Sequence, residues 1–214
     1  MLNVAVLVSG GGTNLQAILD AKAAGALPHA KIALVLASKP GVYALERASK
    51  AGVPGIVVAR KSYAAPEEYD AALLAALREH RIDVVVLAGF LSILGPSVIT
   101  AYPERILNVH PSLIPSFCGA GYYGLRVHEA ALAKGVKVTG ATVHFVNEVP
   151  DGGRILLQQA VDVLPGDTPE TLQKRVMEQA EWELLPKAVS LFCEGRIRLV
   201  ENKAVIDSQP ADGE

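Results

Sequence analysis

The sequence predicts an α/β fold: a single doubly wound, mainly parallel sheet flanked by helices, with an antiparallel C-terminal portion. Three observations lead to this prediction. Short valine-rich runs alternate with helical patterns through the first half of the chain, as in parallel sheets with crossover helices. A glycine-rich segment joins the first of these runs to the first helical pattern. After residue 135, two long β-rich segments flank a Gly-Gly turn, which is typical of antiparallel strands.

The first half contains candidate strands and helices in strict alternation. Apolar, valine-rich runs predict strands at residues 3–8, 31–37, 55–59 and 83–88. Helical patterns between them predict helices at residues 14–24, 42–51 and 66–80. The third helix opens with Pro66, Glu67 and Glu68, which suit a first helical turn. Because strand-helix-strand crossovers are right-handed, these elements predict a parallel sheet.

The second half begins with a buried strand at residues 105–113 and then changes character. The β-rich segments 136–146 and 154–164 lie on either side of the turn Asp151-Gly152-Gly153. Residues 196–207 are typical of a short hairpin and residues 208–214 of a frayed tail. We therefore expect one domain over residues 1–207.

A long helix is expected to begin at Pro169 and to end before Gly195. Asp167 or Thr168 can provide its N-cap. Its apolar stripe consists of Leu172, Val176, Ala180 and Leu184.

Composition restricts the class of protein. Half of the 214 residues are hydrophobic, which is enough for one sizeable core. The formal net charge is −2, so the chain lacks the positive electrostatic field of nucleic-acid-binding and membrane-binding proteins. No apolar run approaches the roughly 20 residues that cross a bilayer, and no signal-peptide pattern begins the chain. Cys118 and Cys193 are too few for a disulfide scaffold. We expect a reduced cytoplasmic protein without nucleic-acid or membrane partners.

The segment Ser9-Gly10-Gly11-Gly12-Thr13-Asn14 is a candidate phosphate site. Glycines let an anion approach the backbone, and amides at a helix start point toward it. The alternative is a tight strand-to-helix turn without a ligand. The segment is not a dinucleotide fingerprint, because the third glycine of that pattern falls on Leu15, and it lacks the Lys-Ser/Thr pair of a Walker loop. A phosphorylated metabolite suits it better than NAD or ATP.

Asn108 and His110 are candidate catalytic residues. They lie two residues apart on the strand predicted at 105–113, and therefore on one face near its carboxyl end, where open α/β sheets bind ligands. An amide donor beside an imidazole suits acyl transfer, in which an oxyanion develops and the attacking amine loses a proton. From spacing alone, a hydrogen-bonded structural histidine is the slightly better interpretation.

Five segments together resemble the phosphoribosylglycinamide formyltransferases of purine biosynthesis. They are residues 9–16, 88–94, 108–117, 138–146 and 151–153, and their order and spacing match over residues 3 to about 205. The resemblance implies transfer of a formyl group from 10-formyltetrahydrofolate, a co-substrate, to the glycyl amine of glycinamide ribonucleotide. It implies neither metal nor nicotinamide, and it leaves monomer and homodimer open.

The resemblance also implies roles for particular residues. Asn108, His110 and Asp151 would be catalytic, with Asp151 favouring the imidazolium form of His110. Gly12, Thr13 and Asn14 would bind the substrate phosphate, and Glu181 its ribose. The folate would contact Asn108 and the segment Leu91, Ser92, Ile93 and Leu94. Relative to the family, one extra residue separates Arg175 from Pro186.

Other residues near these motifs have simpler interpretations. His144 is expected to be a hydrogen-bonded structural histidine. His128 opens a helical pattern over residues 128–132 and is expected to face solvent or cap a turn. Cys118 is expected to pack rather than to act as a nucleophile. Residues 119–124 are expected to form a mobile wall of the site.

The same Asn-His-Asp arrangement also resembles that of two related enzymes, formyltetrahydrofolate hydrolase and methionyl-tRNA formyltransferase. Each of these enzymes is expected to carry an additional domain, and the pattern of residues 1–214 does not predict one. A non-catalytic module that binds a phosphorylated ligand through the glycine segment is a further alternative.

Overall fold

The structure, a computed structural model, describes residues 1–209 of the chain. Its strands are hydrogen-bonded in the order β3-β2-β1-β4-β5-β6-β7, and β8 and β9 form a separate pair. This arrangement confirms the predicted α/β fold. Residue contacts group the chain into two compact units, Met1–Asn108 and the residues from Val109 onward. The expectation of one domain over residues 1–207 stays a prediction, and residues 210–214 of the predicted tail lie outside the described residues.

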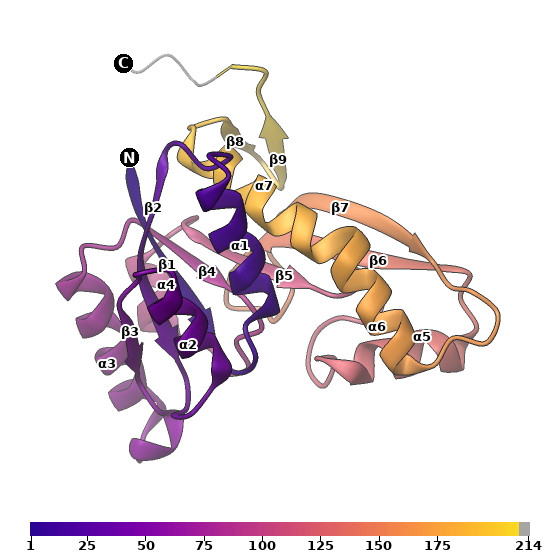
Figure 1. Ribbon diagram of the computed structural model, residues 1–214, viewed down its shortest axis with the longest axis horizontal. Coiled ribbons are helices and arrows are strands. Elements are labelled where there is room, and N and C mark those ends of the chain that lie inside the picture. Colours follow the sequence, from indigo (N-terminus) through magenta and orange to yellow (C-terminus); the bar gives the residue numbers. More distant parts are fainter. Residues whose placement is uncertain (210–214) are drawn as a thin grey trace. The chain divides into compact units, whose positions relative to one another are not determined.

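The first unit contains every strand and helix predicted for it (Figure 1). Helix α4 and the short 3₁₀ helix η1 were not predicted, and β3 stops two residues before the expected end because it is a half-exposed edge strand. In chain order the elements are β1 (Leu2–Val8), α1 (Thr13–Ala23), β2 (Ala30–Ala37), α2 (Tyr43–Lys50), β3 (Gly55–Val57), η1 (Arg60–Ser62), α3 (Pro66–Glu79), β4 (Val84–Leu87), α4 (Pro96–Ala101) and β5 (Ile106–His110).

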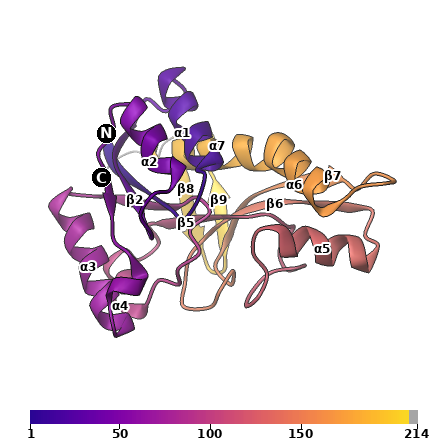
Figure 2. The same cartoon turned by 60° about the horizontal axis from the view of Figure 1, so that its bottom comes forward.

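The sheet of the first unit is parallel and doubly wound. β1 pairs in parallel with β2 and with β4, so the chain moves outward through β2 and β3 and then returns to the other side of β1. Right-handed crossovers then place α1 and α2 on one face and α3 on the opposite face. Figure 2 shows this division, with α4 beside α3. The reversal of direction between β1 and β4 is the position at which such sheets bind ligands.

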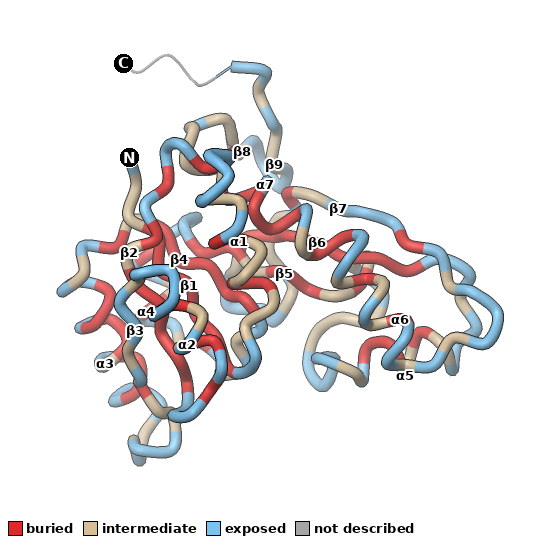
Figure 3. Tube along the Cα trace, viewed as in Figure 1, coloured by how far each residue is buried: buried red, intermediate tan, exposed pale blue. Residues whose placement is uncertain are grey.

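The core of the first unit follows its central strands. Val4 to Val8 of β1 and Val84 to Val86 of β4 have no exposed surface, because helices cover both faces of the sheet (Figure 3). Continuous apolar runs, rather than alternating ones, therefore identified these strands correctly. The carboxyl end of β1 leads into the polar residue Ser9, and Asn108 of the neighbouring strand β5 lies opposite Leu87 at the end of β4.

The second unit contains the predicted antiparallel strands. β6 (Val138–Phe145) pairs antiparallel with β7 (Ile155–Asp162), and the turn with Asp151 connects them. Helix α5 (Leu125–Lys134) precedes β6, and β8 (Ile197–Val200) pairs antiparallel with β9 (Lys203–Ile206), which confirms the predicted hairpin.

The predicted long helix has three parts. It runs through α6 (Pro169–Val176), the π turn η2 (Met177–Glu181) and α7 (Trp182–Cys193). Of the two predicted caps, Thr168 provides the cap, because its hydroxyl accepts the Thr171 amide at 3.3 Å. A π turn accommodates one extra residue in a helix, in agreement with the extra residue expected before Pro186. The predicted stripe from Leu172 to Leu184 is buried.

Candidate active site

Strand β5 supplies the two candidate residues predicted from spacing. Asn108 is half-buried at the end of the pairing between β4 and β5, where it lies opposite Leu87. His110, two residues later on the same strand, is 4% exposed. Side chains two residues apart on a strand point to the same face, so the strand presents an amide and an imidazole together.

Asp151 is positioned by a tight turn between β6 and β7. The Asn147 side chain accepts the Val149 amide at 3.0 Å and donates to the Gly152 carbonyl at 3.3 Å. Gly153 packs so closely that a Cβ atom would lie 1.7 Å from the Phe145 carbonyl oxygen. Asp151 itself has a φ of 54°, a left-handed conformation that few residues other than glycine adopt. Residues with such backbone conformations are concentrated at functional sites, where local strain is tolerated.

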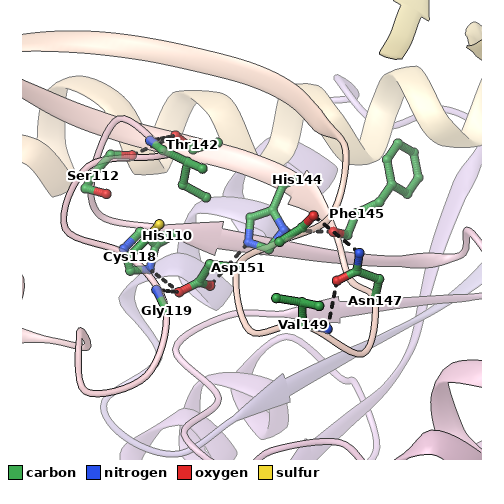
Figure 4. A network of polar contacts seen from close by, with 12 residues as sticks. His110, Ser112, Cys118, Gly119, Thr142, His144, Phe145, Asn147, Val149 and Asp151 are labelled. Atoms are coloured by element: carbon green, nitrogen blue, oxygen red, sulfur yellow. Dashed lines mark hydrogen bonds and ion pairs between the residues drawn. The ribbon is translucent and has the colours of Figure 1, made fainter. Parts of the chain in front are cut away.

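The carboxylate of Asp151 lies between two imidazoles, as Figure 4 shows. Its Oδ2 atom is 3.5 Å from Nδ1 of His110, and its Oδ1 atom is 3.5 Å from Nε2 of His144. The side chains of the two histidines are 5% and 2% exposed. The structure therefore brings together His110 and Asp151, and it adds His144 to them.

The remaining ring nitrogens of both histidines contact backbone carbonyls. Nε2 of His110 lies 2.8 Å from the Phe117 carbonyl oxygen, and Nδ1 of His144 lies 2.8 Å from the Phe145 carbonyl oxygen. A carbonyl only accepts hydrogen bonds, so each of these nitrogens carries the proton. His144 is thus hydrogen-bonded as expected, but its contact with Asp151 was missed, because strand alternation does not reveal what a neighbouring turn contributes.

The electrostatics of the pair partly differ from expectation. Burial lowers the pKa of His110, and this effect outweighs the Asp151 carboxylate and the Phe117 carbonyl, which raise it. Burial alone would raise the pKa of Asp151, but His144, His110 and the Gly119 amide outweigh burial and lower it. Asp151 thus favours the imidazolium form of His110, as predicted, yet the net pKa of that histidine lies below its ordinary value.

The segment after β5 contacts both members of the pair. Gly119 donates its amide to Oδ2 of Asp151 at 2.8 Å, and the Phe117 residue that accepts from His110 has a φ of 49°. Between them, the Cys118 thiol donates to the Pro115 carbonyl, and burial together with Asp151 raises its pKa. A protonated thiol is a weak nucleophile, which supports the packing role predicted for Cys118.

The prediction that His128 faces solvent is wrong. Helix α5 begins at Leu125, one turn earlier than expected, and buries His128 together with Val127 and Ala131. Neither ring nitrogen of His128 has a hydrogen-bond partner within residues 1–209. Burial, followed by the proximity of His110, lowers the pKa of His128 to about 4, so its ring is neutral at neutral pH.

The glycine segment of the first unit joins β1 to α1. Gly12 has a φ of 74°, and a Cβ atom there would lie 2.7 Å from the Cβ atom of Ala44 on α2, so only glycine suits this position. Thr13 is the first residue of α1, and Asn14 is 8% exposed. The three residues predicted to bind phosphate are therefore consecutive at a helix start.

Helix α2 fixes the orientation of this segment. Ala44 donates its amide to the Gly10 carbonyl at 3.3 Å, and Arg47 donates Nε to the Gly11 carbonyl at 2.8 Å. Because the C=O and N–H groups of a trans peptide point in opposite directions, the amides of Gly11 and Gly12 point away from α2. Two consecutive amides exposed in this way suit an anion. Arg47 was missed because its two hydrogen-bond partners, Gly11 and Gln16, are 36 and 31 positions away in the sequence.

The segment predicted to contact folate follows β4. Leu91 and Ile93 are 60% and 82% exposed, which is unusual for large apolar side chains, whereas Leu94 is buried. The Leu91 amide donates to the Ser9 hydroxyl at 2.9 Å, which links the segment to the start of the glycine segment. Ser92 is half-buried between them.

Glu181 ends the π turn η2 in the second unit and is 6% exposed. The additional residue in this turn changes which side chains face inward after it, because a π turn advances the helix by one residue more than an α turn. A buried carboxylate at this position is unusual for a structural helix residue.

Comparison with known proteins identifies the family. The model of the family described as "Formyl transferase" matches residues 2–189. The phosphoribosylglycinamide formyltransferase of Haemophilus influenzae is 42% identical over 98% of this chain and 95% of its own. The crystal structure of glycinamide ribonucleotide transformylase 1 from Symbiobacterium toebii is 42% identical, with a TM-score of 0.91 over 97% of this chain and 95% of that one.

A formyltetrahydrofolate deformylase is also similar, but less so. The structure of this protein from Pseudomonas syringae pv. tomato is 27% identical, with a TM-score of 0.85 over 97% of this chain and 67% of that one. No helix within residues 1–209 is long and apolar enough to span a membrane. The resemblance seen in the five sequence motifs is confirmed over nearly the whole length of the chain, which belongs to the formyl transferase family.

Proposed function

We propose that the chain transfers the formyl group of 10-formyltetrahydrofolate to the glycyl amine of glycinamide ribonucleotide. The products are formylglycinamide ribonucleotide and tetrahydrofolate. The observation that carries this proposal is the pair of buried His110 and half-buried Asp151, with Asn108 two residues before His110 at the carboxyl end of β5. The names of the most similar relatives support the same reaction.

The residues of the pair suit the proposed chemistry. The amine forms a bond to the formyl carbon, and the carbonyl oxygen takes up negative charge in the tetrahedral intermediate. An amide of Asn108 and an imidazolium of His110 stabilise such an oxyanion. The bond from carbon to the folate nitrogen then breaks, with a proton supplied to that nitrogen, while the attacking amine loses one. Asp151 favours the protonated form of His110 that this sequence requires.

The resting site has to change before His110 can act on a substrate. Nε2 contacts the Phe117 carbonyl and Nδ1 faces Asp151, so both ring nitrogens have protein partners. An N–H group of His110 reaches a substrate oxygen only when one of these partners is replaced. The contact with Phe117 holds the donor in place until then.

The glycine segment supports a phosphorylated substrate. The amides of Gly11 and Gly12 point away from α2, and those of Thr13 and Asn14 belong to the first turn of α1, where an anion is stabilised. We assign the substrate phosphate to Gly12, Thr13 and Asn14. The ribose would be held by Glu181, whose carboxylate accepts hydrogen bonds from hydroxyl groups.

The segment Leu91 to Leu94 supports a bound folate. Leu91 and Ile93 offer apolar surface to a pterin ring. We assign the hydrogen bonds to the edge of that ring to the backbone of this segment. The formyl carbon keeps its oxidation state during transfer, so the reaction as proposed requires neither a metal nor a redox cofactor. Whether the protein is a monomer or a homodimer stays a prediction.

The test is the formation of tetrahydrofolate from 10-formyltetrahydrofolate, measured by absorbance with and without glycinamide ribonucleotide. A transferase forms product only when the ribonucleotide is present. Product formed equally without it would indicate a hydrolase, and no product would indicate a binding module; either result would contradict the proposal. As a control, Asn108→Ala should lower kcat by about 10²-fold, the loss that follows removal of one oxyanion donor.

A further inference from the structure

A half-buried carboxylate between two buried histidines raises the question of where the protons of the site reside. We propose that His144 is a positioning residue that holds Asp151 and shares a single proton with His110 across that carboxylate. The role of His144 in catalysis rests on the proposed function, whereas the sharing of the proton does not.

The first step concerns the two backbone carbonyls. The carbonyls of Phe117 and Phe145 lie 2.8 Å from Nε2 of His110 and Nδ1 of His144, and each fixes an N–H on the nitrogen that it contacts. A neutral imidazole carries only one N–H. If both histidines were neutral, Nδ1 of His110 and Nε2 of His144 would therefore both present lone pairs to the Asp151 oxygens, 3.5 Å away.

That arrangement is electrostatically unfavourable, and one proton relieves it. A proton on either facing nitrogen converts a repulsive contact into a charge-assisted one. The proton does not reside on Asp151, because His144, His110 and Gly119 keep the pKa of this carboxyl below its ordinary value in spite of burial. It resides on one histidine or on the other.

Burial limits the number of protons to one near neutral pH. With one proton, the carboxylate and one imidazolium form a cluster without net charge. With two, the cluster has a net positive charge within side chains that are 2–14% exposed, and burial of unpaired charge is costly. Two sites that compete for one proton titrate as a pair, with macroscopic pKa values that belong to neither residue alone.

Two further titratable groups within residues 1–209 interact with the cluster, and neither supplies nor removes this proton at neutral pH. His128 on α5 faces His110, but its pKa of about 4 keeps it neutral. Cys118 faces Asp151, and the raised pKa of its thiol keeps it protonated. The competition is therefore between His110 and His144.

The consequence for the reaction concerns His110. Whenever the proton resides on His144, His110 is neutral and cannot stabilise an oxyanion as an imidazolium. In agreement with this, the proximity of His144 lowers the pKa of His110. His144 thus sets the fraction of molecules in which His110 is ready to act.

The sharing is tested directly by NMR on the full chain with ¹⁵N-labelled histidines, without substrate, from pH 5 to 9. Two-bond correlations between ring protons and nitrogens identify which nitrogen carries each proton. We expect Nε2 of His110 and Nδ1 of His144 to stay protonated throughout, and the facing nitrogens to titrate together in two steps. Two independent one-step titrations, or the opposite neutral tautomer on either ring, would overturn the proposal.

The catalytic consequence is tested with His144→Gln, which keeps a donor toward Asp151 but takes up no proton. His110 should then titrate in one step. Because it no longer shares its proton, the plateau of kcat should rise by about twofold and the alkaline limb should move to lower pH by about 0.3 unit, the changes expected for equal sharing. His29→Gln, on an exposed histidine, is the control and should change nothing. A purely structural His144 would lower kcat equally at every pH, with the limb in place, and that result would contradict the proposal.

The two proposals fail in different ways. If the NMR titration shows sharing but the wild-type protein transfers no formyl group, only the proposed function is wrong. If the protein is a transferase but its two histidines titrate independently, only the sharing of the proton is wrong.

Discussion

At the scale of single residues, the chemistry of the site depends on what each imidazole contacts. His110 and Asp151 could be predicted from the family motifs, and the structure places them 3.5 Å apart. The two carbonyls that fix the ring protons could not be predicted. They belong to Phe117, in an irregular segment, and to Phe145, whose carbonyl direction depends on the turn that follows. Backbone direction leaves little signal in side-chain identity.

The contribution of Asp151 to His110 leads to a prediction about pH. Asp151→Asn removes a charge that raises the pKa of His110 and leaves the lowering by burial in place. The pKa of His110 should fall, and the alkaline limb of kcat should therefore move to lower pH, without the rise in the kcat plateau expected for His144→Gln. The pH dependence of kcat checks this.

The double variant provides the control for the Asp151→Asn experiment. In a His110→Ala background, Asp151→Asn should change kcat very little, because the effects of substitutions in residues that act as a unit are not additive. An undiminished effect in that background would show that Asp151 acts independently of His110.

At the scale of elements, hydrophobic periodicity located most strands and helices but missed a short helix, an early helix start and a π turn. The buried runs of β1, β2 and β4 were recognised because both faces of a parallel sheet are apolar. Helix α4 spans only Pro96–Ala101, too short for a helical period to be visible, and α5 began one turn earlier than its pattern. The π turn was indicated only by the one residue in excess before Pro186.

Helix α2 gives a prediction about the phosphate. Arg47→Met removes the bond from the guanidinium to the Gly11 carbonyl and frees the peptide that presents the Gly12 amide. The KM for glycinamide ribonucleotide should rise about tenfold, the effect of losing one charge-assisted hydrogen bond worth roughly 1.5 kcal/mol, while the KM for the folate stays constant. Steady-state kinetics with each substrate varied in turn measures both.

Lys50 offers a matched control for Arg47. It lies on the same helix and over the same Tyr43 ring, but its hydrogen bond within residues 1–209 goes to the Tyr43 hydroxyl and not to the glycine segment. Lys50→Met should therefore leave both KM values unchanged. Equal increases in the two variants would indicate a general effect of positive charge rather than a specific effect on the segment.

At the scale of the whole molecule, stability in acid should depend on the start of the long helix. Asp167 accepts two hydrogen bonds from Arg175 at 2.6 Å, and these lower its pKa. A carboxyl with a depressed folded-state pKa stabilises the fold above its unfolded pKa of about 4, and this stabilisation is lost as pH falls toward the folded value.

Asp167→Asn should accordingly lower the Tm at pH 7 by about 2–4 °C, the shift produced by roughly 1 kcal/mol in a chain of this size. The difference from wild type should shrink at pH 3, where the wild-type carboxylate loses part of its contribution. Thermal unfolding followed by circular dichroism measures this. Lys174→Met, which breaks an exposed pair with Glu178 on the same helix, should have little effect at either pH.

The left-handed backbone at Asp151 restricts which amino acids evolution can place there. Glycine, asparagine and aspartate accept a φ of 54° with the least strain, and among them only aspartate carries a charge. Glutamate would preserve the charge but would strain the turn. The backbone conformation thus restricts the position to a few amino acids, and the need for a negative charge leaves only aspartate among them.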